Sequence, residues 1–81
     1  MRTTENILDN IQNNLLAGDS TIYFEHGYTY PKIGNRQIIG VTPKQVIFKV
    51  GTKSFSKMKR DDLLKIESEI INYYNFVKAT V

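Results

Sequence analysis

The spacing of the apolar residues changes twice along this 81-residue chain, and that change constrains the fold more than any other feature. Over residues 4–17 and again over residues 57–78, apolar side chains recur every three or four positions, which places them on one face of a helix. Between these segments apolar and polar residues alternate, as they do in strands that are buried on one side. The sequence therefore predicts a helix at each end and a sheet between them.

The first helix is expected to begin after the capping residue Thr3 or Thr4 and to end before Gly18. Its apolar face consists of Ile7, Leu8, Ile11, Leu15 and Leu16. For the second helix, Ser56 is a candidate cap, and Asp61 and Asp62 are the signal of an alternative, later start. The apolar stripe consists of Leu63, Ile66, Ile70, Tyr74 and Val77, widened by Leu64, Ile71 and Tyr73. We expect this stripe to pack on the sheet, and a homodimer contact through part of it is the alternative.

The middle of the chain predicts an antiparallel meander of three strands, with a fourth if residues 53–56 also pair. The strands are expected at residues 20–30, 36–41 and 45–50, with a loop at residues 31–35 and a turn at residues 42–44. Gly51 and Thr52 are expected to form the next two-residue turn. Two helices on one face of this sheet make a small two-layer α+β domain of order α-β-β-β-α, which we expect to span residues 1–81 as a single compact domain.

Strict alternation assigns each strand residue to one face of the sheet. The side chains expected to face the helices are Ile22, Phe24, Ile39, Val41, Val46, Phe48 and Val50. Those expected on the outer face are Tyr23, Arg36, Ile38, Gly40, Gln45, Ile47 and Lys49. On this assignment Arg36 and Lys49 lie on the same open face of the sheet.

The charged residues are distributed unevenly, although their sum is a net charge of only +3. Residues 1–31 carry a net charge of −3 and residues 61–81 carry −2, whereas residues 32–60 carry +8 and contain no carboxylate. This layout concentrates positive potential on the predicted sheet and on the entry into the last helix. The expected partner is therefore rich in anions, either a nucleic acid or an acidic protein surface.

We expect the protein to bind this partner through basic side chains interleaved with tyrosines, a combination that suits phosphates and stacked bases. The candidate residues are Arg36, Lys44, Lys49, Lys53, Lys57, Lys59, Arg60, Tyr23, Tyr28 and Tyr30. Because most of the basic residues are lysines, diffuse contact with a backbone is favoured over readout of bases. The alternative for this segment is a solvated edge whose lysines protect a strand from unwanted pairing.

A protein–protein interaction module is the second functional class that fits this composition. Exposed Ile38 and Ile47, together with the tyrosines, would then form an apolar contact patch. Such a module would be an inhibitor of a host protein, or a structural, homo-oligomeric component such as a virion connector.

Residues suited to catalysis or metal binding are few. The chain has one histidine, His26, and contains no cysteine, Walker loop or nucleophile elbow. In a strand Glu25 and His26 point to opposite faces, so they do not form a catalytic pair. Asp62 and Glu69 share a helix face that a divalent ion could touch, but pairs four residues apart such as Asp61 and Lys65, which support the helix, are the favoured explanation of these acids. We expect neither an enzyme nor a cofactor, a metal site or a small-molecule substrate.

The apolar runs are all shorter than a bilayer-spanning segment, and the N-terminus lacks the apolar core of a signal peptide. No Asn-x-Ser/Thr glycosylation sequon occurs. We therefore expect a cytoplasmic protein without a membrane partner.

The order helix, hairpin, helix resembles that of the small head–tail joining proteins of tailed phages. The resemblance is carried by Leu16-Ala17-Gly18 at the end of the first helix, Val46-Ile47-Phe48 in the third strand, and Asp62-Leu63 at the entry to the last helix. It implies a phage origin and a connector-like role. The small size and the high content of Asn, Ile, Lys and Tyr would also suit an inhibitor of a host system that is encoded by a phage or a mobile element. The three-strand meander departs from the pattern of that family, and no site residue is carried over from it.

Overall fold

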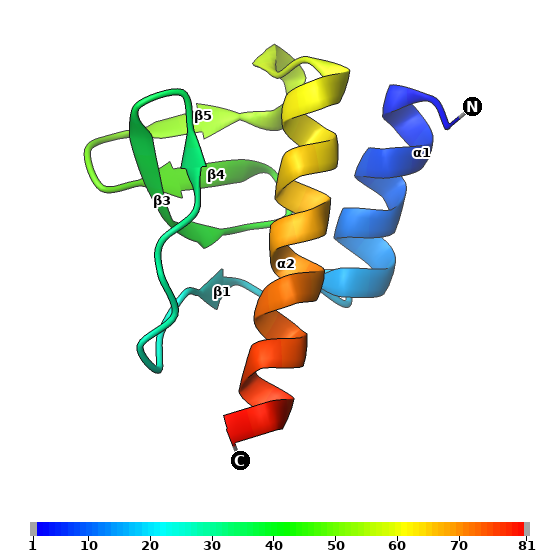
Figure 1. The fold of residues 1–81 in the computed structure, drawn as a ribbon. Helices are drawn as coiled ribbons and strands as arrows, with labels where there is room; N and C mark the ends of the chain where they lie inside the picture. The colour runs from blue at the N-terminus through cyan, green and yellow to red at the C-terminus, as the bar shows by residue number, and fades with distance from the viewer. Residues whose placement is uncertain (1, 81) are drawn as a thin grey trace.

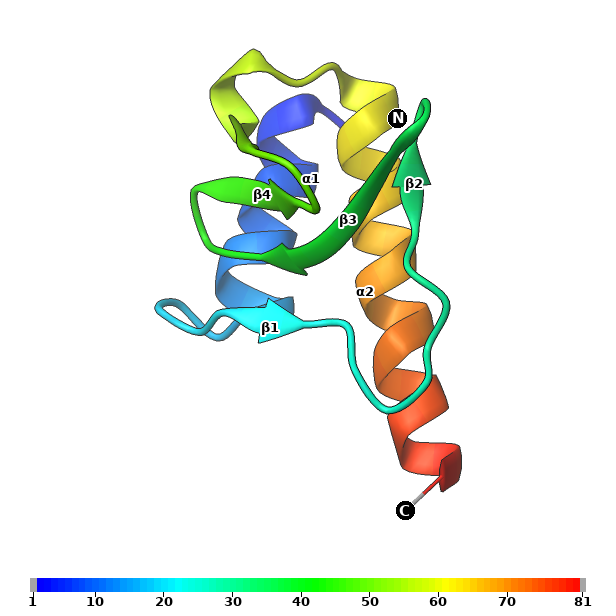
Figure 2. The same cartoon turned by 90° about the vertical axis from the view of Figure 1, so that its left-hand side faces the viewer.

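An antiparallel sheet forms one layer of the domain, and two main helices form the other (Figure 1). The computed structural model describes residues 2–80, and its elements are α1 (Thr4–Asp9), η1 (Asn10–Leu15), β1 (Ile22–Tyr23), β2 (Lys32–Ile33), β3 (Arg36–Val41), β4 (Gln45–Phe48), β5 (Thr52–Ser54), η2 (Phe55–Lys57) and α2 (Arg60–Thr80). Both main helices lie behind the sheet in Figure 2, and no helix of the described residues covers the face turned to the viewer. The expected α+β class is confirmed, with five strands in place of three or four.

The first helix is capped by Thr3, one of the two residues predicted to cap it, and changes from an α-helix to a π-helix after Asp9. Thr3 Oγ1 accepts a hydrogen bond from the amide of Asn6 (3.1 Å), and Asn6 Oδ1 accepts one from the amide of Thr3 (3.3 Å). The α-helix α1 continues as the π-helix η1, in which the carbonyl of Leu15 accepts the hydroxyl of Tyr74 at 2.5 Å. Beyond η1, Gly18 adopts a φ of 84°, the left-handed conformation expected of a helix stop.

The strand β3 is the centre of the sheet. β1 and β2 pair with opposite ends of one edge of β3, β4 pairs with its other edge, and β5 pairs with β4. The short β2 lies in the segment predicted to be a loop, and a two-residue turn at Gly34 and Asn35 folds it onto β3. The first predicted strand, over residues 20–30, is shortened to Ile22–Tyr23, because a turn at Gly27 (φ 81°) redirects the chain.

One extra residue in β3 changes which side chains face the helices. Ile38 pairs with Phe48 but Gly40 pairs with Ile47, so the register shifts by one residue between them. Because of this bulge, Ile38 turns inward, and only 1% of its surface is exposed. The predicted outer-face position of Ile38 is therefore wrong, and Ile39, predicted to face the helices, is the half-buried residue at the shift.

The strand β4 ends at Phe48, earlier than the alternation predicts. The amide of Phe48 donates to the carbonyl of Gly51 (2.9 Å), so Lys49 and Val50 form the turn, and Gly51 follows at a φ of 86°. The predicted turn at Gly51 and Thr52 is wrong, because Thr52 already belongs to β5. Val50, predicted to face the helices, lies at the tip of the turn with 84% of its surface exposed.

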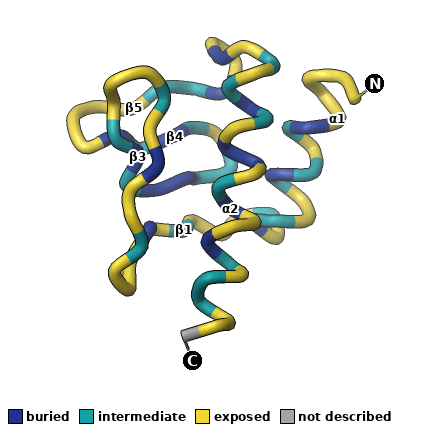
Figure 3. The backbone as a smooth tube through the Cα atoms, viewed as in Figure 1, coloured by how far each residue is buried: buried dark blue, intermediate teal, exposed yellow. Residues whose placement is uncertain are grey.

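The helix-facing side of the sheet and the two helices enclose one hydrophobic core (Figure 3). α2 begins at Arg60, later than the predicted start, and Ser54 rather than Ser56 caps the short η2 before it. Ile71, at the margin of the predicted stripe, is 41% exposed. The residues of the stripe that are buried in the core are Leu63, Ile66, Ile70 and Tyr73.

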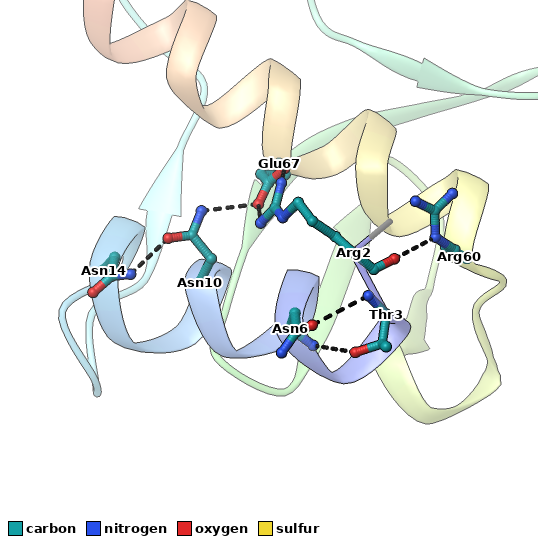
Figure 4. Close-up of polar contacts among 7 residues, drawn as sticks. All are labelled: Arg2, Thr3, Asn6, Asn10, Asn14, Arg60 and Glu67. Carbon is teal, nitrogen blue, oxygen red and sulfur yellow. Dashed lines mark hydrogen bonds and ion pairs between the residues drawn. The ribbon is translucent and has the colours of Figure 1, made fainter.

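A polar network fastens the N-terminal segment to α2 (Figure 4). Arg2 donates two hydrogen bonds to the carboxylate of Glu67, from Nη1 to Oε1 at 2.6 Å and from Nη2 to Oε2 at 2.5 Å. Asn10 Nδ2 donates to the same carboxylate at 2.8 Å, and Arg60 Nε donates to the backbone carbonyl of Arg2 at 2.8 Å. The hydrogen bond from Arg2 holds the pKa of the Glu67 carboxyl below its ordinary range, although burial of this residue opposes the shift.

Gly40 has no room for a side chain. A Cβ atom at this position would lie 2.8 Å from Tyr23 Cδ1 and 2.9 Å from the carbonyl oxygen of Ile22. Gly40→Ala is therefore expected to lower the free energy of unfolding by about 1–3 kcal/mol, the usual cost of overpacking. Urea denaturation measures the change, with Thr52→Ala on the exposed edge strand as a control that should stay within about 0.5 kcal/mol of wild type. An unchanged urea midpoint for Gly40→Ala would contradict the close packing of β1 on β3.

The contact between Arg2 and Glu67 predicts acid sensitivity. Because the pKa of Glu67 is lower in the folded protein than in the unfolded chain, the contact stabilises the fold fully above the ordinary carboxylate range. This contribution is lost as the pH falls through the lowered folded value. Denaturation at a series of pH values from about 6 down to about 2 should show the loss in wild type, and Glu67→Gln should show a smaller one. Equal pH dependence in the two proteins would exclude Glu67 as its source.

Candidate binding surface

The outer face of the sheet carries a row of side chains in register across four strands. In this row Tyr23 lies opposite Gly40, Gly40 opposite Ile47, and Ile47 opposite Thr52. Residues that pair in this way share one face of the sheet. Tyr23 lies against Gly40 and is still 50% exposed, so half of its surface is available to a ligand.

Lysines stand at one end of this face. Lys32 pairs with Gln37 across β2 and β3, and the amide of Lys49 donates to the carbonyl of Gln37 at 2.9 Å. Both lysines are exposed. Lys49 directly follows β4, and the hydrogen bond of its amide holds it beside Gln37 at this end of the sheet. The outer face thus combines an exposed tyrosine with positive charge within a short distance.

A hollow of about 260 Å³ lies at the same end of the sheet, lined by residues of the turn between β2 and β3 and of the turn after β4. Arg36 is fixed in this hollow, because its Cζ lies 3.8 Å from the centroid of the Phe48 ring and its Nη2 donates to the carbonyl of Val50 at 3.0 Å. A cation over an aromatic ring is attracted by the electron-rich face of the ring. The residues that line the hollow are Asn35, Arg36, Gln37, Phe48, Lys49 and Val50.

Arg36 reaches the hollow from the helix-facing side of the sheet. It pairs with Ile33, which packs against the core, and it points to the same side as Ile38, two residues further along β3. The prediction that Arg36 shares the outer face with Lys49 is therefore wrong. The bulge is the reason, since it reverses the alternation of the first half of β3 relative to the half that contains Val41. The hollow nevertheless brings Arg36 and Lys49 together.

Two of the predicted basic residues lie away from this end of the sheet. Lys44 is exposed in the turn between β3 and β4, beside a second hollow of about 410 Å³ that Asp19 also lines. Lys53 pairs with Val46 and therefore points to the helix-facing side, where it is half-buried. Neither residue lines the hollow that contains Arg36.

The junction before α2 carries a separate basic cluster. Lys57 in η2 and Lys59 directly after it are exposed. Arg60 is half-buried, and its Nε holds the backbone carbonyl of Arg2, so part of its hydrogen-bonding capacity serves the fold. Asp61, in the first turn of α2, offsets some of the charge at this junction.

The predicted tyrosines do not gather on one face. Tyr28 packs in an aromatic cluster, with its ring centroid 5.8 Å from that of Phe24 and 5.3 Å from that of Tyr73. Its hydroxyl donates to Glu69 Oε2 at 3.2 Å, and burial, followed by the nearby carboxylate, raises the pKa of Tyr28. Tyr30 lies in the loop before β2 and is 36% exposed. Tyr28 is therefore engaged in packing, whereas Tyr23 belongs to the open face.

The positive charge of residues 32–60 is not neutralised by ion pairs. Within residues 2–80 the structure contains one ion pair, between Arg2 and Glu67, and both of its members lie outside the basic segment. The cations on the sheet are consequently available to an external anion, whereas Asp61 offsets part of the charge at the junction.

Lys32 and Phe48 are absent from the predicted set of site residues. Lys32 belongs to the segment predicted to be a loop, although its alternation with Ile33 and the following Gly34 and Asn35 are signals of a hairpin. Phe48 is correctly predicted to face the helices, but its second contact, with Arg36, depends on the register of β3 and β4, which the sequence does not reveal.

The described residues contain neither a cluster of metal-ligating side chains nor a helix that could span a membrane. In this part of the chain no group of three or more His, Cys, Asp or Glu side chains could hold a metal ion. None of its helices has the length and apolar character needed to cross a membrane. His26 is exposed in the turn after β1, with a φ of 60°.

Comparisons with known proteins identify no relative. No protein-family model, curated protein or solved structure matches the chain. The resemblance to phage head–tail joining proteins stays a prediction, and the surface described above is the basis for a functional proposal.

Proposed function

We propose that this protein is a non-catalytic, cytoplasmic module that binds single-stranded nucleic acid across the outer face of its sheet. The observation that supports this best is the uncovered row that contains Tyr23 and Ile47, with Lys32 and Lys49 at one end. A tyrosine provides a stacking surface for any base, and lysines follow the phosphates of the backbone. Both kinds of contact are tolerant of sequence.

A single strand fits this surface better than a duplex does. A reader of the major groove needs a helix or a β-ribbon that presents basic and polar side chains to the bases. The first turn of α2 carries Asp61 and Asp62, and the exposed residues of α1 include Glu5 and Asp9, so neither helix suits that role. An open sheet with an exposed aromatic ring is instead typical of proteins that stack unpaired bases.

The expected affinity is modest. Three or four phosphate contacts on a single strand predict a slope of log K against log salt of about −2 to −3, with dissociation constants in the micromolar range or weaker. Stacking on Tyr23 would add about 1–3 kcal/mol.

Fluorescence anisotropy with a labelled oligothymidylate of about 12 nucleotides tests the proposal. At about 50 mM salt the wild type should bind saturably, and rising salt should weaken the complex. Lys49→Glu should lower the affinity by about tenfold or more, and Tyr23→Leu by about fivefold or more. Lys65→Glu is the matched control, because Lys65 is an exposed lysine on α2, in the helix layer, and should stay within about twofold of wild type.

Two results would overturn this proposal. One is the absence of binding by the folded wild-type protein at low salt. The other is an equal loss of affinity in Lys65→Glu and Lys49→Glu, which would indicate general charge attraction without a site. Tighter binding of a duplex of the same length would replace the single strand as the partner.

A protein partner is the second candidate, because Val50 exposes 84% of its surface beside the hollow. An exposed valine contributes little to a phosphate backbone but suits the apolar centre of a protein interface. The module would then act as an inhibitor of an acidic host protein or as a self-associating component such as a virion connector. Light scattering that shows an oligomer insensitive to salt in wild type and a monomer in Val50→Ser would favour self-association over nucleic-acid binding.

A further inference from the structure

Arg36 is held in position while most of its hydrogen-bonding capacity is unused. The guanidinium lies over the ring of Phe48, with 3.8 Å between Cζ and the ring centroid, and one Nη2–H donates to Val50. A guanidinium has five N–H donors. Within residues 2–80, the carbonyl oxygen of Val50 is the one acceptor to which Arg36 donates. The other donors are available to a ligand in the hollow.

We propose that the hollow between Arg36 and Lys49 is a phosphate subsite that holds one phosphodiester group of the bound strand. This assignment rests on the proposed function and adds to it the point at which the strand is anchored. The strand would run from this anchor along the outer face toward Tyr23.

The chemistry of the lining matches a phosphate. The planar fork of Arg36 can donate to two oxygens of one phosphate, and Lys49 adds a second positive charge. The side-chain amides of Asn35 and Gln37, which also line the hollow, are further donors. No carboxylate is among the lining residues, so an anion meets no like charge there. A volume of about 260 Å³ accommodates a phosphate group and several waters, since each water occupies about 30 Å³.

Arg36 differs from Lys57 and Lys59 at the junction because contacts within the protein hold its side chain in place. A long side chain that is free in solution loses rotamer entropy when it binds, and this loss weakens the contact. Arg36 has already lost much of this freedom through its contacts with Phe48 and Val50. Lys57 and Lys59 are exposed and make no hydrogen bond or ion pair through their side chains within the described residues. The stronger contact with a phosphate is therefore expected at Arg36.

Side-chain nuclear magnetic resonance provides the first test, with Arg60 as a control inside the same molecule. On titration with the oligothymidylate, the Nε–Hε signal of Arg36 should shift in proportion to binding. The signal of Arg60 should not move, because its Nε is bonded to the carbonyl of Arg2. A parallel titration with an oligoglutamate of equal charge examines a carboxylate-bearing partner. A larger shift of the Arg36 signal with the peptide would overturn the assignment to phosphate.

Substitution at Arg36 provides the second test. Arg36→Lys keeps the charge and removes the fork, so it should weaken oligothymidylate binding by about fivefold to tenfold with an unchanged salt slope. Arg36→Ala should weaken binding at least as much and should reduce the magnitude of the slope by about 0.7. Lys65→Ala, which removes one charge from the helix layer, should change neither quantity by a measurable amount. Because Arg36 is exposed, these variants should fold, and circular dichroism verifies this.

The failure of the subsite is distinguishable from the failure of the proposed function. If wild type binds the oligonucleotide and Arg36→Lys binds it equally well, the phosphate subsite is refuted and the proposed function stands. If the folded wild type does not bind at about 50 mM salt, the proposed function is refuted and the subsite with it.

Discussion

The one-residue bulge in β3 is the constraint on which the rest of the structure depends. With uninterrupted alternation, Ile38 and Val41 would point to opposite faces of the sheet, and one of the two would lie in water. With the bulge both are buried, and the helices cover a continuous apolar surface. The same shift places Gly40 on the outer face opposite Tyr23, where the tyrosine ring leaves no room for a side chain.

The bulge also determines the form of the binding surface. Because Arg36 lies two residues before Ile38, it points to the same helix-facing side, and its guanidinium lies over the ring of Phe48. Lys49 lies beside Gln37 at the end of the outer face. Positive groups from different strands therefore converge on one hollow at the end of the sheet. A feature that the packing of the core requires thus places Arg36 in contact with Phe48 and Val50.

Two glutamates of α2, Glu67 and Glu69, form hydrogen bonds away from the basic surface and so do not lower its positive charge. Glu67 is buried, and its carboxylate accepts hydrogen bonds from Arg2 and Asn10, which join the N-terminal segment and the first helix to α2. Glu69 accepts the hydroxyl of Tyr28 at the aromatic cluster. Neither carboxylate reaches the basic segment, and a buried carboxylate is stable only with such partners. These two carboxylates therefore do not offset the charge of the basic segment, whereas Asp19 lies beside Lys44 and Asp61 lies at the junction before α2.

The helices of this protein were more predictable than its turns and the faces of its strands. The apolar period of residues 4–17 and 57–78 depends on local geometry, and so does the cap at Thr3, so both could be predicted from neighbouring residues alone, although α2 itself spans Arg60–Thr80. The two-residue strand β2 and the early end of β4 depend on pairing with β3, which lies elsewhere in the chain. Phe48 was predictable as a core residue, but its contact with the guanidinium of Arg36 was not.

The sequence by itself determined that a helix lies at each end of the chain with a sheet between them, the α+β class and the concentration of positive charge in residues 32–60, because periodicity and charge can be read from consecutive residues. The tertiary structure alone decided which of those charges meet. It joined Arg36 and Lys49 in one hollow, turned Lys53 toward the helices and bound Arg60 to the N-terminal segment. The physical reason is pairing between residues far apart in the chain, and for Arg36 this pairing includes a single bulge that reverses the direction of the side chains that precede it in the strand.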